Sequence, residues 1–173
     1  MKIKRFEFNM FPVNCYVLWD DTKEAVVIDP GCFYEEEKQA LKKFILTNEL
    51  NVKHLLNTHL HLDHIFGNPF MLKEFGLSAE ANKADEYWID EAPKQSRMFG
   101  FQLQEEPVPW ANTCMTEISS LSDIPNWKRY TCPDIHPAAW CTIAKKTTAC
   151  SPATSCSKAA SAALISQEVT SMN

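Results

Sequence analysis

Three histidines and an aspartate lie within six residues of one another, at His59, His61, Asp63 and His64. Imidazole and carboxylate groups are ligands that Zn²⁺ takes in protein sites, and Fe and Mn also accept them. On an extended segment His59 and His61 point to the same side, so both can meet one metal ion. Asp63 and His64 follow where the chain turns toward the next helix, and they can face a second metal ion.

A metal ion held by these side chains would support hydrolysis, because it lowers the pKa of a bound water to about 7 and so yields hydroxide at neutral pH. The alternative is that polar histidines merely occupy a turn, and a single histidine would favour that interpretation. Three histidines and an aspartate at H-x-H-x-D-H spacing, directly behind an apolar segment, favour a metal site. We therefore predict that His59, His61, Asp63 and His64 are metal ligands.

Five other residues of metal-binding types are interpreted differently. His54 lacks a partner at ligand spacing, so we expect a strand or surface residue, and His136 lies in a segment of unusual composition. Cys15 and Cys32 are expected to be small buried side chains rather than ligands. Asp29 either orients a metal ligand through its carboxylate or is simply a turn residue, and we favour the first interpretation.

Strands must position these side chains. Alternating or continuous apolar residues predict strands at residues 3–8, 15–19, 25–28 and 52–56. The strand at 25–28 ends at the turn residues Asp29-Pro30-Gly31. The strand at 52–56 carries the chain directly into the histidine cluster, so we expect the cluster at the carboxyl end of that strand.

Helices are predicted from a spacing of three to four residues between apolar side chains. An amphipathic helix is predicted over residues 35–47, where Leu41, Phe44 and Ile45 recur at that spacing among charges. A short helix over residues 69–75 is closed by Gly76. A further helix is predicted over residues 80–98. Its inner face is expected to contain the following large side chains: Tyr87, Trp88 and Met98.

The histidine motif and its setting resemble the metallo-β-lactamase superfamily. Residues 58–64 have the sequence THLHLDH and are followed by Gly67-Asn68. Residues 14–16 (NCY) and 27–31 (VIDPG) resemble the hydroxyacylglutathione-hydrolase-like branch of that superfamily. The resemblance covers residues 1–109. It implies an α/β fold, the αββα sandwich, with a dinuclear site between the two sheets, and these residues correspond to the N-terminal half of it.

The resemblance also implies roles. His59 and His61 would ligate the first metal, while Asp63 and His64 would ligate the second, and Asp63 would be a possible proton acceptor. An intact domain would hold two zinc ions, with Fe or Mn as alternatives, and would hydrolyse a small-molecule ester or thioester. Two alternatives stay open: another superfamily hydrolase (lactonase, β-lactamase or phosphodiesterase), or a non-catalytic metal-binding module.

Charge and composition indicate which partners to expect. The formal net charge of −5 argues against a nucleic-acid or anionic-membrane partner, because both select for basic patches. No stretch of the sequence approaches the roughly 18 apolar residues of a membrane span, and no signal-peptide pattern is present at the start. An odd count of seven cysteines without a C-x-x-C pair argues against a disulfide framework. We therefore expect a cytoplasmic protein with a small-molecule substrate.

The composition changes at about Trp110. All four glycines and all ten phenylalanines lie before residue 102, whereas five of the seven cysteines lie after residue 109. Leu, Ile, Val and Phe together account for only 8 of residues 110–173, which is below the roughly 20% that a packed core needs. We expect residues 110–173 not to fold natively, and divide the chain into a half-domain at 1–109 and an aberrant segment at 110–173.

A shifted reading frame is our hypothesis for that segment. The resemblance requires three more ligands downstream: a histidine in a G-H-x-x-G-type loop, a bridging aspartate and a last histidine. His136, followed by proline, does not match them. Read in the neighbouring frame with permitted third bases, residues 131–139 give V-P-G-H-S-P-G-S and residues 149–158 give L-F-S-G-D-V-L-F-K. Both stretches resemble downstream signatures of the superfamily, and both contain the missing glycines.

Overall fold

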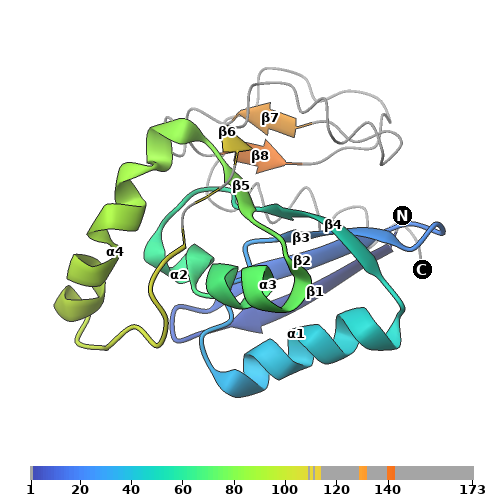
Figure 1. The fold of residues 1–173 in the computed structure, drawn as a ribbon, viewed down its shortest axis with the longest axis horizontal. Helices are drawn as coiled ribbons and strands as arrows, with labels where there is room; N and C mark the ends of the chain where they lie inside the picture. The colour runs from blue at the N-terminus through green and yellow to red at the C-terminus, as the bar shows by residue number, and fades with distance from the viewer. Residues whose placement is uncertain (1, 109, 111, 114–128, 132–139, 143–173) are drawn as a thin grey trace.

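The computed structural model describes residues 2–108, 110, 112–113, 129–131 and 140–142. Predictions for His136 and for most of the segment 110–173 lie outside the described residues. The described part of the chain forms a sheet with helices packed on it and a separate two-stranded pair (Figure 1).

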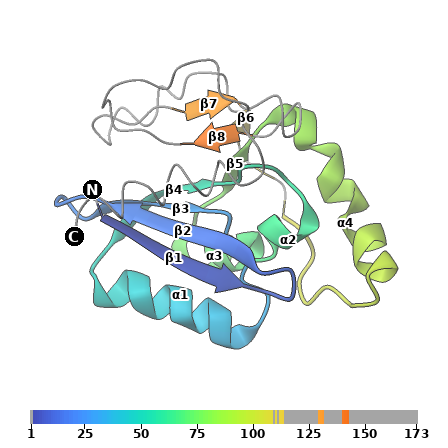
Figure 2. The same ribbon diagram turned by 180° about the vertical axis from the view of Figure 1, so that it is seen from behind.

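Six strands form the main sheet in the order of the chain. The first three pair antiparallel and the rest pair parallel. They are β1 (Lys2–Phe8), β2 (Val13–Trp19), β3 (Glu24–Ile28), β4 (Asn51–Leu56), β5 (Ala79–Ala81) and β6 (Asn112–Thr113). The separate pair consists of β7 (Arg129–Thr131) and β8 (Trp140–Thr142), and in both views it lies on the side of the sheet opposite the first helix (Figures 1 and 2).

The helices follow β3, β4 and β5. They are α1 (Glu35–Thr47), α2 (Leu62–Ile65), α3 (Asn68–Phe75), the 3-10 helix η1 (Lys83–Asp85) and α4 (Tyr87–Met98). Gly76 ends α3 with φ of 68°, a left-handed conformation that glycine adopts at little cost. In the described part of the chain, none of these helices is both long enough and apolar enough to span a membrane.

The core lies between the sheet and the helices α1 and α3. Leu41 and Ile45 of α1 and Met71 of α3 are buried against Val17 and Leu55 of the sheet. The amphipathic pattern therefore predicted α1 with its bounds and its buried face correctly. At 0% or 1% exposed, the side chains Leu41 and Ile45 each contribute about 1.5–3 kcal/mol through burial.

The prediction of one helix over residues 80–98 is wrong at its start. Residues 79–81 form β5, and the helix α4 begins only at Tyr87. Its buried face contains Trp88, Ala92 and Ser96, which recur at intervals of four. Tyr87 and Met98 lie on a different face and are 49% and 76% exposed, so only Trp88 of the three predicted inner residues packs inward.

The parallel strands bring two loops to one edge of the sheet. Ile28 at the end of β3 pairs with Leu56 at the end of β4, and the Asp29 N–H donates to the Leu56 carbonyl at 2.9 Å. The loops that follow these strands therefore begin side by side. In open α/β sheets, ligands bind beyond the carboxyl ends of the strands. Asp29 and the segment from Thr58 to His64 both lie at this edge.

Candidate metal centre

The segment after β4 separates its apolar and polar side chains by alternation. Leu60 and Leu62 are 0% and 2% exposed, and they pack in a cluster of buried residues below the loop. His59, His61 and Asp63 alternate with them and are only partly buried. The two leucines are therefore anchored in the core, while the three polar side chains stay partly accessible.

The imidazole rings lie together, as their spacing predicts. The ring centroids of His59 and His61 are 4.5 Å apart, and those of His59 and His64 are 4.0 Å apart. Oδ2 of Asp63 lies 3.7 Å from Nε2 of His64. The four predicted ligands are therefore near neighbours at the carboxyl end of β4, and the two histidines at H-x-H spacing are not on opposite faces.

Asp29 is the buried anchor of this cluster. Its carboxylate accepts hydrogen bonds from the Thr58 N–H at 2.8 Å and the Thr58 hydroxyl at 2.7 Å, and its Oδ2 lies 3.1 Å from Nδ1 of His64. Burial by itself raises the pKa of the Asp29 carboxyl. The charge and hydrogen bond of His64, the charge of His59 and the hydrogen bond from Thr58 together lower this pKa by more, so it lies below its usual value. Asp29 also adopts a positive φ of 49°, so it is both a turn residue and a partner of a predicted ligand.

The donor set fits a metal such as zinc in one specific respect. A metal-bound histidine usually donates its other ring N–H to a carboxylate or carbonyl, which fixes the ring orientation. His64 places Nδ1 against Asp29 and Nε2 on the side of Asp63. Within the described ranges, however, no three His, Cys, Asp or Glu side chains are arranged to hold an ion as they stand. The cluster therefore brings imidazole and carboxylate groups, which are suitable metal ligands, close to one another.

Two buried asparagines brace the backbone of the motif: Asn57, which the sequence patterns did not single out, and Asn68. Asn57 Nδ2 donates to the His64 carbonyl at 3.1 Å, and Asn68 Nδ2 donates to Asn57 Oδ1 at 2.9 Å. Both asparagines are 3% exposed. Buried hydrogen bonds of this kind specify one arrangement, because an unsatisfied alternative costs about 1–3 kcal/mol. Asn68 belongs to the quoted Gly67-Asn68 signature, so that signature has a structural role here.

The remaining metal-binding residue types behave as predicted where the structure describes them. Cys15 and Cys32 are both 0% exposed, and burial raises the pKa of the Cys32 thiol to about 12 and also raises that of Cys15. These thiols are small buried side chains. His54 lies on β4, where its Nδ1 is 2.7 Å from Oε1 of Glu80 on β5, so it pairs across the sheet and takes no place in the cluster.

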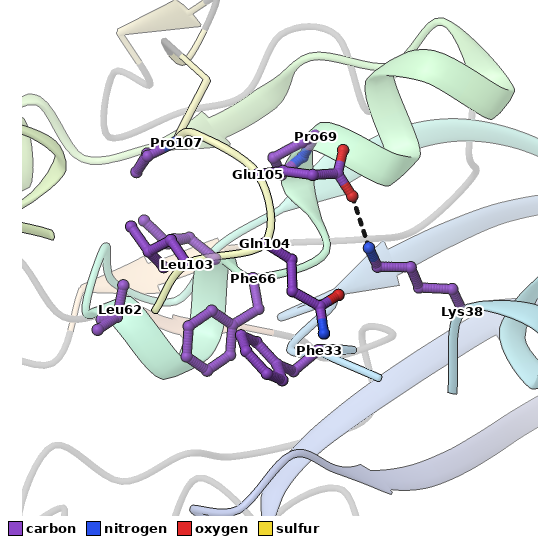
Figure 3. Close-up of a pocket in the computed structure, with 10 residues that line it drawn as sticks. Phe33, Lys38, Leu62, Phe66, Pro69, Leu103, Gln104, Glu105 and Pro107 are labelled. Carbon is purple, nitrogen blue, oxygen red and sulfur yellow. Dashed lines mark hydrogen bonds and ion pairs between the residues drawn. The ribbon is translucent and has the colours of Figure 1, made fainter. Parts of the chain in front are cut away.

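A small pocket lies next to α2, where Leu62 of this helix and Phe66, which directly follows it, face the loop after α4 (Figure 3). Figure 3 shows Lys38 of α1 reaching Glu105 of that loop, with Nζ 2.5 Å from Oε1. The Lys38 side chain is only 8% exposed. This ion pair fastens the loop over the helix that carries Asp63.

Replacing Thr58 by valine tests whether the Asp29 anchor stabilises the cluster. Valine keeps the branched shape but removes the hydroxyl that donates to buried Oδ2 of Asp29 at 2.7 Å. We expect a loss of about 1–3 kcal/mol in the free energy of unfolding, because a buried acceptor loses a donor. Urea denaturation measures it.

Thr22→Val is the matched control for Thr58→Val. Thr22 also donates its hydroxyl to an aspartate, Asp20, at 2.5 Å, but at an exposed turn. We expect Thr22→Val to change the stability by no more than about 0.5 kcal/mol. Equal effects of the two substitutions would mean that burial of the Asp29 carboxylate has no energetic consequence.

The profile of the metallo-beta-lactamase superfamily matches residues 9–132. That is 124 of the 173 residues, so the chain belongs to the metallo-β-lactamase superfamily. The match includes the cluster and extends beyond residue 109 into the segment of unusual composition. The division of the chain at residue 109 therefore stays a prediction.

Curated relatives are similar to the same part of the chain. The hydroxyacylglutathione hydrolase GloC of Haemophilus influenzae is 35% identical over 115 residues, which cover 65% of this chain and 52% of the relative. A hydroxyacylglutathione hydrolase of Pelagibacter ubique is 34% identical over 77 residues, covering 44% and 30%. In these alignments the chain spans about half or less of the length of its relatives.

Solved structures share the fold. TTHA1623 in a di-iron-bound form aligns with a TM-score of 0.65 at 16% identity, covering 98% of this chain and 87% of that one. The B3 metallo-beta-lactamase BLEG-1 aligns with a TM-score of 0.62 at 23% identity, covering 80% and 65%. These similarities confirm the α/β metallo-β-lactamase fold that the resemblance implied.

Proposed function

We propose that this chain carries the first metal-binding half of a hydrolase that cleaves thioesters of the hydroxyacylglutathione type. The observation that carries the proposal is the partly exposed cluster of His59, His61 and His64 with Asp63, at the carboxyl ends of β3 and β4. Support for the thioester comes from the two curated relatives described above, which are named hydroxyacylglutathione hydrolases and are 35% and 34% identical to this chain.

His59 and His61 would hold the first metal, and Asp63 and His64 the second, with zinc as the first choice and iron or manganese also suited to these ligands. When bound, the metal supplies a water whose pKa is lowered to about 7. The chain's own residues orient the site. Asp29 fixes the ring of His64, and Asp63, whose carboxylate lies beside that ring, is the proposed proton acceptor.

Trp88 of α4 packs against one side of the cluster. Its ring meets that of His61 edge to face, with centroids 4.6 Å apart and an angle of 90° between the planes. An aromatic ring in this position limits the orientations of His61 and keeps water from that side of it.

The shifted reading frame of residues 110–173 is part of the same proposal. In the superfamily to which the resemblance points, the remaining ligands come from the second half of the domain, and that half is here replaced by a segment poor in large apolar side chains. A replaced second half would explain why the alignment with the GloC relative covers only about half of that protein. The chain as written should therefore be a poor catalyst.

Restoring the frame near codon 110 tests this function. We expect the restored protein to hydrolyse a hydroxyacylglutathione thioester at least on the order of 100-fold faster than the chain as written, because complete enzyme sites accelerate reactions by about 10⁶-fold or more. The measurement is kcat/KM for the thioester beside a lactone, a β-lactam and a phosphodiester.

The outcomes of this experiment are distinct. Preference for another ester in the panel would overturn the thioester assignment and keep the hydrolase. A restored protein that binds metal without any hydrolysis would point to a non-catalytic module. An uninterrupted frame in the nucleotide sequence around codons 105–115 would refute the explanation of the second half.

A further inference from the structure

Asn9 connects two loops that no short sequence pattern links. It lies in the turn between β1 and β2, where it adopts a φ of 57°. Its Nδ2 donates to the carbonyl of Gly31 at 2.7 Å and to the carbonyl of Asp63 at 3.0 Å. Its Oδ1 accepts from the Phe11 N–H at 2.8 Å. Both amide hydrogens and the amide oxygen are therefore used.

The backbone of Asn9 is itself held in place. Its N–H donates to Oε1 of Glu37 at 2.7 Å. The other oxygen of the Glu37 carboxylate accepts from the N–H groups of Phe33 and Tyr34, at 2.8 and 3.0 Å. Glu37 thus fastens the turn to the beginning of α1, and the amide of Asn9 is oriented before any ligand binds.

The Asp63 carbonyl is available to Asn9 because α2 ends early. In a longer helix the Gly67 N–H would donate to the Asp63 carbonyl, four residues earlier. Here it donates to the Pro30 carbonyl at 2.7 Å. Asn9 supplies a replacement donor, so the first turn of α2 is held from outside the helix.

The close approach at this point depends on Gly31. A Cβ at Gly31 would lie 2.7 Å from the Asp63 carbonyl oxygen and 2.8 Å from Asn9 Nδ2. Glycine therefore leaves the space in which one amide group reaches both carbonyls. Three independent features converge on this contact: the positive φ of Asn9, the missing Cβ of Gly31 and the early end of α2.

We propose that Asn9 is a positioning residue, which holds the first turn of α2 in the orientation that directs Asp63 and His64 toward the site. Its consequence for metal binding rests on the function proposed above. Asn9 is partly buried and reaches only backbone atoms, so it acts through Asp63 and not on the substrate. Partners that orient metal ligands from outside typically change metal affinity by about 10–100-fold.

Two substitutions in the full chain separate this role from folding. Asn9→Gly keeps the left-handed backbone at little cost and removes the side chain. Asn9→Asp keeps the shape and the Oδ1 acceptor but places an oxygen against two carbonyl oxygens. Asn48→Asp is the matched control, because Asn48 Nδ2 donates to the Phe44 carbonyl at 2.9 Å at the other end of α1.

Two properties of each variant are measured. The first is the NMR signals of the His59 and His64 rings in the absence of metal, and the second is the zinc affinity by competition with a chelator. We expect both Asn9 variants to shift the ring signals and to weaken zinc binding about 10–100-fold, and Asn48→Asp to do neither.

Ring signals and zinc affinity that match the unaltered chain in both Asn9 variants would overturn the positioning role. The two results can also differ. If the Asn9 variants shift the ring signals, but zinc binding does not depend on His59 and His61, the positioning role stands and the proposed function is refuted. The two proposals therefore fail in distinguishable ways.

Discussion

Replacing Gly67 by alanine should destabilise the chain by at least about 4 kcal/mol, beyond the usual range for overpacking of a core. A Cβ at this position would lie 2.2 Å from the carbonyl oxygen of Pro30 and 2.4 Å from Sγ of Cys32. The first atom belongs to the backbone and the second to a buried side chain, so neither can move aside without a large cost in free energy. Urea denaturation of the variant beside the unaltered chain measures the loss.

The loss should extend to the site. The Gly67 N–H donates to Pro30 at 2.7 Å, and Pro30 directly follows Asp29. Moving this loop to accommodate a methyl group would draw Asp29 away from Thr58 and His64. We therefore expect the Gly67→Ala variant to lose zinc binding together with stability.

Gly76→Ala is the control for Gly67→Ala. Gly76 has a φ of 68°, but apart from its immediate chain neighbours and its own helix no atom lies within 4 Å of the position that its Cβ would take. We expect only the conformational cost of a left-handed alanine, about 1–2 kcal/mol. A Gly67→Ala variant no less stable than Gly76→Ala would show that the loop at Pro30 can move freely, against the tight packing described here.

The second large effect is expected from the double substitution His59→Ala with His61→Ala. By the function proposed above, the unaltered chain carries four of the superfamily's ligands, so we expect it to bind zinc weakly and at fewer than two ions per chain. Removing two of the four should weaken zinc binding on the order of 100-fold or more, since loss of an outer partner alone costs about 10–100-fold. Metal analysis after dialysis gives the zinc content of each chain.

His54→Gln controls for the loss of a histidine as such. His54 is held by Glu80 within the sheet and takes no place in the cluster. We expect its zinc content to equal that of the unaltered chain. Retention of zinc by the double variant, or equal loss in His54→Gln, would place the zinc outside the motif.

Local patterns predicted the elements whose burial is decided by their own residues. The apolar spacing in α1 predicted its bounds correctly. Leu41 and Ile45 are buried on one face of the helix, and their spacing along the chain alone identifies that face. The H-x-H-x-D-H spacing likewise predicted the clustering of the rings, because the histidines are close in sequence and Leu60 and Leu62 among them are buried in the core.

The predictions that failed or were missing depend on contacts between distant residues. The stretch 79–81 forms a strand because it pairs with β4 and β6, and its three residues give too short a signal to compete with the helical pattern that follows. Asn9 is 54 residues from Asp63 and was not foreseen. The one local signal is that asparagine tolerates a positive φ in a turn, and this indicates a turn rather than a bridge between loops.

Lys38 illustrates the same limit. On an amphipathic helix a lysine is expected at the solvent face, yet its side chain is 8% exposed because Glu105 supplies a partner 67 residues away. Pairing across the fold, which no periodicity encodes, decides whether such a charge is buried.

A crystal structure of the zinc-soaked chain, with data collected at the zinc absorption edge, would show whether the histidine motif holds a metal ion. We expect an anomalous peak between the rings of His59 and His61, with ring nitrogens about 2.0–2.1 Å from the ion and Asp63 or His64 beside it. A zinc ion bound elsewhere on the chain, with the rings of the cluster turned away from any metal, would contradict the claim that this motif is a metal centre.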